Sequence, residues 1–166
     1  DVLVIAPTVT LEKNVKGTFQ VFASKSIHLK KGVQLQYPSS LVLLQKEAPK
    51  AINSNRTKIH GIKIDNNALV KGPVLFYSDD KKNGYDTQIL IEENAQVIGE
   101  VYCTKNLELR GKVSGVVYTN NFIAKQAGSV YSNHLYNAKI NSSTISPKYN
   151  GLFIDEENKQ VAKWVE

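Results

Sequence analysis

An internal repeat, in which apolar or small residues recur two positions apart, constrains the fold of this chain more than any other feature. Its clearest copy runs Ile89-x-Ile91, then Ala95-x-Val97-x-Gly99-x-Val101-x-Cys103. Further copies begin at Val9, Ile27, Ile62, Leu107 and Phe122, and Ala138-x-Ile140 resumes the pattern. The clean intervals between starting positions are 18, 18, 15 and 16 residues. A period of this length made of two-residue alternations indicates a repeat architecture built from strands.

The repeat is too short for a pair of helices, and it fits one turn of a parallel β-solenoid. We therefore predict an all-β, single-stranded parallel β-helix of about eight coils, in which alternate side chains point inward. Six-residue spacing from Val9 through Val33 is typical of a left-handed β-helix. The coils of 15 and 16 residues break that spacing, so a right-handed helix is favoured.

The pattern predicts one domain over residues 1–146, with polar loop insertions at about 45–58 and 77–88. Residues 147–166 leave the repeat and are expected to form a C-terminal cap. The apolar residues Leu152, Phe153, Ile154 and Trp164 would cover the last coil or form a docking surface. A capped end would oppose end-to-end stacking.

Composition limits the remaining classes of protein. The chain has no Met and begins at Asp1, so we expect a piece of a longer protein whose missing N-terminus held a signal or membrane anchor. Its single cysteine, Cys103, has no partner for a disulfide and is predicted to be a small buried hydrophobe. No apolar run is long enough to cross a membrane. The net charge of +6 comes from scattered lysines with only two arginines, which predicts solvated strand edges rather than a nucleic-acid site. An anionic polymer remains the alternative partner.

The stretch from Asn94 to Tyr118 reads NAQVIGEVYCTKNLELRGKVSGVVY, and it resembles the bactofilin family of polymer-forming bacterial cytoskeletal proteins. The resemblance covers about residues 62–140. It implies a right-handed triangular β-helix without catalysis or cofactor that acts as a scaffold through end-to-end polymerisation. The two insertions and the expected cap depart from that family and weigh against filaments.

Candidate chemical groups do not form a recognisable site. A zinc site needs converging ligands, usually with two close in sequence, whereas His28, His60 and His134 lie in different coils. His134 is predicted to point inward. Adjacent carboxylates such as Glu92 and Glu93 point to opposite faces of a strand. The loop from Asp79 fails the calcium-loop spacing. We therefore predict no enzyme activity, catalytic residue, metal site or cofactor.

The expected function is that of a non-catalytic structural or scaffolding module of a bacterial envelope or cytoskeletal protein. Partners would be further copies of the chain, an envelope protein or a polysaccharide, with membrane contact only through the missing N-terminus. The cell envelope or extracellular space is favoured, with a cytoplasmic scaffold as the alternative. The rival hypothesis is a carbohydrate-binding or carbohydrate-processing β-helix. Its contact residues, which would also serve a protein partner, are Tyr77, Tyr85, Tyr102, Tyr118 and Trp164.

Overall fold

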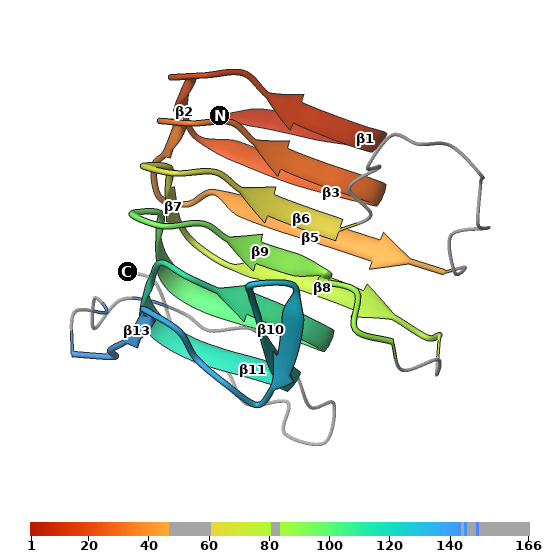
Figure 1. Cartoon of the computed structure of the whole chain (residues 1–166). Coiled ribbons are helices and arrows are strands. Elements are labelled where there is room, and N and C mark those ends of the chain that lie inside the picture. The colour runs from red at the N-terminus through yellow and green to blue at the C-terminus, as the bar shows by residue number, and fades with distance from the viewer. Residues whose placement is uncertain (47–60, 81–83, 144, 146–148, 150–166) are drawn as a thin grey trace, which may run out of the picture.

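The computed structural model describes residues 1–46, 61–80, 84–143, 145 and 149, and every regular element in these ranges is a β-strand. This confirms the predicted all-β class for the described part of the chain. The strands form layers that follow one another in chain order from the N-terminal to the C-terminal end (Figure 1). Their bounds are β1 (Val2–Leu11), β2 (Lys16–Gly17), β3 (Phe19–Leu29), β4 (Gln34–Leu35), β5 (Ser40–Gln45), β6 (Gly61–Ile64), β7 (Leu69–Lys71), β8 (Val74–Ser78), β9 (Ile89–Ile91), β10 (Gln96–Leu109), β11 (Lys112–Gln126), β12 (Ser129–Ser132) and β13 (Lys139–Ile140).

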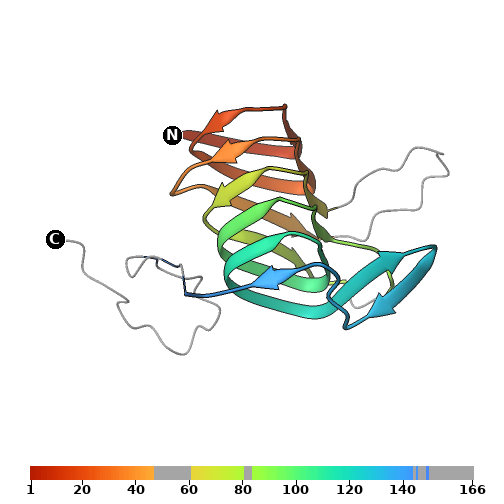
Figure 2. The ribbon, with the colours of Figure 1, turned by 60° about the vertical axis from the view of Figure 1, so that its left-hand side comes forward.

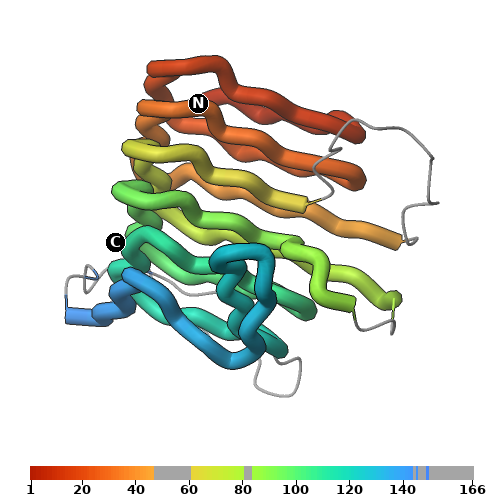
Figure 3. Tube along the Cα trace, viewed as in Figure 1, coloured from red at the N-terminus to blue at the C-terminus, as the bar shows by residue number. Residues whose placement is uncertain are grey.

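Strand pairing confirms that the repeat phrases are structurally equivalent. The starting residues of six phrases form one parallel ladder, in the order Val9, Ile27, Ile62, Ile89, Leu107 and Phe122. The ladder continues across the longer sequence intervals of 35 residues before Ile62 and 27 before Ile89. Equal phase in the sequence therefore places residues side by side in space, as the tube in Figure 3 lets the reader follow.

Two further parallel ladders complete each layer. One passes through Val4, Val21, Leu41, Val74, Val101 and Val117. The other passes through Gly17, Leu35, Val70, Val97, Val113 and Ile140. Inward side chains of the three ladders meet in a single apolar core. Burial of these aliphatic side chains is the main contribution to stability, at about 25 cal/mol per Å² of apolar surface removed from water.

The hydrogen-bonded strands close into a ring, so the prediction of an open single-stranded β-helix is wrong. Six parallel strands form a closed barrel in the order β10, β8, β5, β3, β6 and β9, which returns to β10. The other strands pair outside this ring. Closure arises because β3 and β10 are long, and each pairs with one set of strands along its first part and with another along its second. Two-residue alternation does not show that a strand continues into a second set of neighbours.

The parallel pattern ends earlier than predicted. The sequence after Phe122 was expected to run through another copy of the phrase, but β12 turns back and pairs antiparallel with the end of β11. All four residues of β12 are exposed. Ile140 pairs with Val113, in the middle of a phrase, so Ala138-x-Ile140 does not start a new one. The predicted cap over residues 147–166 lies outside the described residues apart from Tyr149.

Turns between the layers use a left-handed residue at a constant position. Four residues that directly precede an inward aliphatic residue have positive φ: Asn14 (62°), Gly32 (76°), Asn67 (59°) and Asn94 (58°). Asparagine and glycine are the residues that tolerate this conformation best. A second conserved geometry occurs one strand later, where Gly72 and Gly99 have φ of 141° and 148° and pack against a neighbouring backbone carbonyl. The glycine of the repeat phrase is therefore required by the close approach of successive layers.

Candidate interaction surfaces

An apolar stripe crosses the outer face of the second ladder from the N-terminal to the C-terminal end. Its members are paired rung by rung, in the order Ile5, Phe22, Val42, Leu75, Tyr102 and Tyr118. The ends of the stripe are open to solvent, with Ile5 74% and Tyr118 46% exposed, whereas its middle members are half-buried. Leu44 and Tyr77 form a paired, exposed extension beside it. A run of this kind exceeds the isolated apolar residues normal on a surface.

Three of the five predicted contact residues meet on this face. Tyr102 and Tyr118 are direct cross-strand partners with ring centroids 6.4 Å apart and planes inclined by 49°. Tyr77 lies on the same outer side, and its hydroxyl is hydrogen-bonded to Asp79, which raises the pKa of Tyr77. The inclined ring pair is an ordinary aromatic contact rather than a flat platform for a sugar ring.

The other two predicted contact residues do not join them. Tyr85 lies in the loop between β8 and β9 and is 67% exposed. Trp164 lies outside the described residues. The predicted set is therefore a partial surface made of Tyr77, Tyr102 and Tyr118.

The N-terminal end of the stack presents an open strand edge. β1 is ten residues long and pairs only with β3 among the described residues. Exposed apolar side chains line the same strand: Val2 (47%), Leu3 (65%) and Ile5 (74%). An unpaired edge with apolar side chains is a template for pairing with another strand.

Charged groups gather on the outer face of the first ladder. Asp65 Oδ2 lies 2.9 Å from His28 Nε2, and Asp65 Oδ1 lies 3.0 Å from Lys63 Nζ. Burial acts to raise the pKa of Asp65, but the hydrogen bonds and charges of Lys63 and His28 outweigh it and hold that pKa below its usual value. Further along, Lys30 Nζ binds Glu12 at 2.8 Å.

Arg110 joins two carboxylates that the sequence did not bring together. Its guanidinium donates to Glu92 Oε2 at 3.1 Å and to Glu108 Oε1, with 2.9 Å from Nε. Glu108 is almost fully buried, and its second oxygen accepts a bond from the Thr87 hydroxyl at 2.9 Å. Burial opposes the charge, but the two carboxylates raise the pKa of Arg110 above its usual value. The 18-residue interval from Glu92 to Arg110 is the repeat period and was the available signal.

A buried asparagine holds the loop before β9. Asn106 Nδ2 donates to the carbonyl oxygens of Gly84 at 2.7 Å and Asp86 at 2.9 Å. Its Oδ1 accepts a bond from Asn121 Nδ2 at 3.1 Å, and its backbone N–H donates to Gln88 Oε1 at 3.0 Å. Sequence reasoning missed this network, although the asparagines lie 15 residues apart at equivalent positions of adjacent phrases. The network is structural, because every polar atom of Asn106 faces a partner from the protein itself.

The titratable residues considered as ligands lie apart. His28 pairs with Asp65, whereas the prediction that His134 points inward is wrong: it is exposed and lies 6.0 Å from the Tyr131 ring. His60 is outside the described residues. In the described ranges, no group of three or more His, Cys, Asp or Glu side chains is arranged to hold a metal.

Cys103 and Tyr149 are the groups whose pKa values change most. Cys103 is 2% exposed, as predicted for a small buried hydrophobe, and burial raises its pKa to about 11. The Tyr149 hydroxyl accepts a hydrogen bond from the Glu100 backbone N–H at 3.1 Å. Burial raises the pKa of Tyr149 to about 12. Tyr149 thus fixes one point of the C-terminal segment beside β10.

Comparison with protein-family models, curated proteins and solved structures found no match. The resemblance to bactofilins therefore stays a prediction from the sequence. None of the described residues belongs to a helix with the length and hydropathy needed to span a bilayer.

Proposed function

We propose that the protein is a non-catalytic assembly module that self-associates through the edge of β1. The observation that carries this proposal is the open ten-residue edge together with its exposed Val2, Leu3 and Ile5. Strand addition to such an edge satisfies backbone donors and acceptors and buries the side chains that flank them.

The core at the same end supports a covering partner. Four apolar residues there pack against the core while remaining only partly buried: Val4, Ala6, Val15 and Phe19. Their counterparts one layer further in, such as Val21 and Val33, have no exposed surface. A partner strand over β1 would extend the same parallel or antiparallel ladder and complete this burial.

Hydrogen-bond alternation locates the pairing segment. The Val2 N–H donates to the Thr18 carbonyl at 3.0 Å, so alternation directs the N–H groups of Leu3 and Ile5 to the open edge. Pro7 has no N–H and interrupts the donors further along. The segment available to a partner is therefore residues 2–6.

A second copy of the chain fits this segment. β1 of one copy offers the donors and acceptors that β1 of another requires, and a two-fold pairing uses the same patch twice. Such an interface needs no separate complementary surface. Assembly in this form supports a scaffolding role without chemistry at the contact.

The test is the mass of the purified chain by size-exclusion chromatography with light scattering, followed by electron microscopy. We expect species at multiples of 18.5 kDa. Ile5→Lys places like charges opposite one another across the interface and should return the protein to monomer. Leu44→Lys adds the same charge at an exposed apolar position away from β1 and should leave assembly unchanged. A wild-type chain that stays monomeric at high concentration contradicts the proposal.

A further inference from the structure

The C-terminal end of the stack is basic and free of carboxylates. No Asp or Glu occurs in residues 109–154. The described lysines of this region are Lys112, Lys125 and Lys139. None of the three belongs to an ion pair with a described residue. Lys112 and Lys139 are direct partners of β11 and β13, so two uncompensated positive charges lie side by side.

The same end carries exposed apolar and aromatic side chains. Every residue from 125 to 137 is exposed. The large apolar members of this end, with their exposed fractions, are Val130 (41%), Tyr131 (48%), Leu135 (45%), Tyr136 (50%) and Ile140 (40%). They belong to the hairpin of β11 and β12 and to the segment that returns through β13. The hairpin projects beyond the stacked layers (Figure 2).

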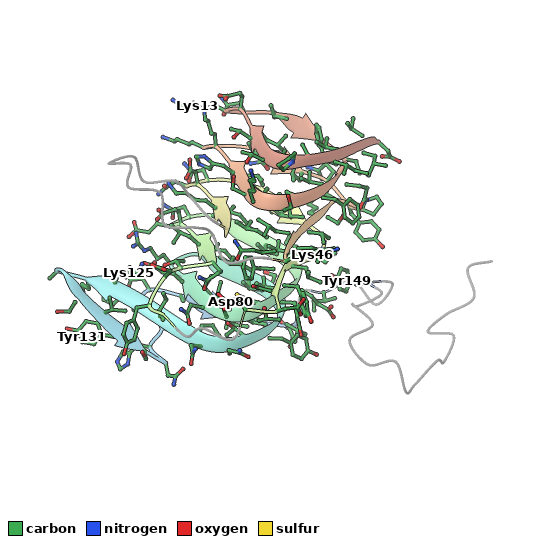
Figure 4. The ribbon with its side chains drawn as sticks, turned by 90° about the vertical axis from the view of Figure 1, so that its right-hand side faces the viewer. Lys13, Lys46, Asp80, Lys125, Tyr131 and Tyr149 are labelled. Carbon is green, nitrogen blue, oxygen red and sulfur yellow. The ribbon has the colours of Figure 1, made fainter. Side chains whose placement is uncertain are left out.

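Cross-strand pairing mixes the two kinds of side chain. Lys125 pairs directly with Val130, and Ala124 pairs with Tyr131. Figure 4 shows Lys125 and Tyr131 together on the projecting hairpin, at the end of the molecule opposite Lys13. Charge and apolar surface are therefore presented by one element rather than by separate faces.

We propose that this end, which we call the basic end, docks peripherally on an anionic lipid bilayer. Aliphatic side chains such as Val130 and Leu135 gain by leaving water only if an apolar phase receives them. Tyrosines favour the boundary between the headgroups and the acyl chains, where the ring is apolar and the hydroxyl remains wet. Lysines near an anionic surface add electrostatic attraction.

The chemistry favours a bilayer over an acidic polysaccharide. A polysaccharide would satisfy the lysines and contact Tyr131 and Tyr136, but it offers no apolar interior for Val130, Leu135 or Ile140. The inference goes beyond the proposed function, because it concerns the end opposite β1. Docking through the basic end would leave the β1 edge accessible for assembly.

Vesicle co-sedimentation of the full chain tests the inference. We expect binding to vesicles of phosphatidylcholine with 30% phosphatidylglycerol, weak binding to pure phosphatidylcholine, and loss of binding as salt screens the charges. The substitution Lys125→Glu should weaken partitioning by roughly fivefold or more, as expected for a lysine near an anionic surface. Lys13→Glu makes the same charge change at the other end and is the matched control. Circular dichroism checks that each variant is folded.

A second pair of variants tests the apolar contribution. Val130→Ser combined with Leu135→Ser should weaken vesicle binding without changing net charge, while Leu44→Ser should not. The inference is overturned by absence of vesicle binding, by equal loss in Lys125→Glu and Lys13→Glu, or by binding that needs only the charges. Binding to soluble dextran sulfate without binding to vesicles would overturn it in favour of an acidic polymer. Each of these results leaves β1 assembly to be judged separately by light scattering.

Discussion

A methyl group on Gly115 would overlap the carbonyl oxygen of Gly99, because the two glycines are direct partners in β11 and β10. Gly115→Ala should therefore force the two strands apart and lower the free energy of unfolding by about 1–3 kcal/mol, as overpacking of a tight core does. Urea denaturation measures this difference.

Gly84→Ala is the matched control for that substitution. An added Cβ there would meet Asp86 at an ordinary contact of 3.9 Å. We expect its unfolding midpoint to stay near that of the wild type. Equal stability of the Gly115→Ala protein would contradict the assigned close approach of these layers.

The Asn106 network predicts a local effect on the loop before β9. Asn106→Ala would remove both donors that bind the carbonyls of Gly84 and Asp86 and should cost about 2 kcal/mol of stability. Limited proteolysis should cut residues 84–88 faster in this variant. Asn66→Ala, an exposed asparagine, is the control. If both variants are cut at the same rate, Asn106 does not hold the loop.

Asp65 predicts a pH-dependent contribution to stability. Its pKa is lower in the folded protein than in the unfolded chain, so the stability it contributes is present above pH 3.8 and is lost as pH falls below that value. Asp65→Asn should lose about 1 kcal/mol at pH 7 and show a shallower decline in acid.

Chemical denaturation between pH 2 and pH 7 checks this, with Glu93→Gln as the control because Glu93 is exposed. A wild-type profile as flat in acid as that of Asp65→Asn would show that Lys63 and His28 do not stabilise the carboxylate.

Cys103 predicts slow thiol labelling. Burial raises its pKa to about 11, and the reactive thiolate is therefore scarce at pH 8. The native protein should react with a disulfide-exchange reagent at least tenfold more slowly than the protein in 6 M guanidinium chloride. Fast labelling of the native protein would mean that the thiol is accessible.

Much of the core could be predicted from alternation alone. Residues at one phase of the phrase, such as Ile27, Ile62 and Ile89, are stacked and fully or almost fully buried. The contact tyrosines were only partly predictable. Tyr102 and Tyr118 meet because they occupy one phase, whereas Tyr85 lies in a loop whose position depends on Asn106 rather than on any period.

Networks at the edges of the repeat could not be predicted from neighbouring residues. Arg110 binds Glu92 from the preceding layer and Glu108 from its own strand. The contact depends on how far each side chain reaches across a turn, and two-residue alternation carries no information about that reach.

The sequence by itself determined the β-structure, the equivalence of the phrases and the residues that face inward, because a strand alternates sides every residue and apolar side chains must be buried. Only the tertiary structure decided that the strands close into a ring and that the parallel pattern ends where β12 turns back. Closure depends on β3 and β10 each pairing with two sets of strands, and the reversal depends on a turn at Ala127 and Gly128, both of positive φ. These are long-range hydrogen bonds and local backbone conformations, neither of which is written in the spacing of apolar residues.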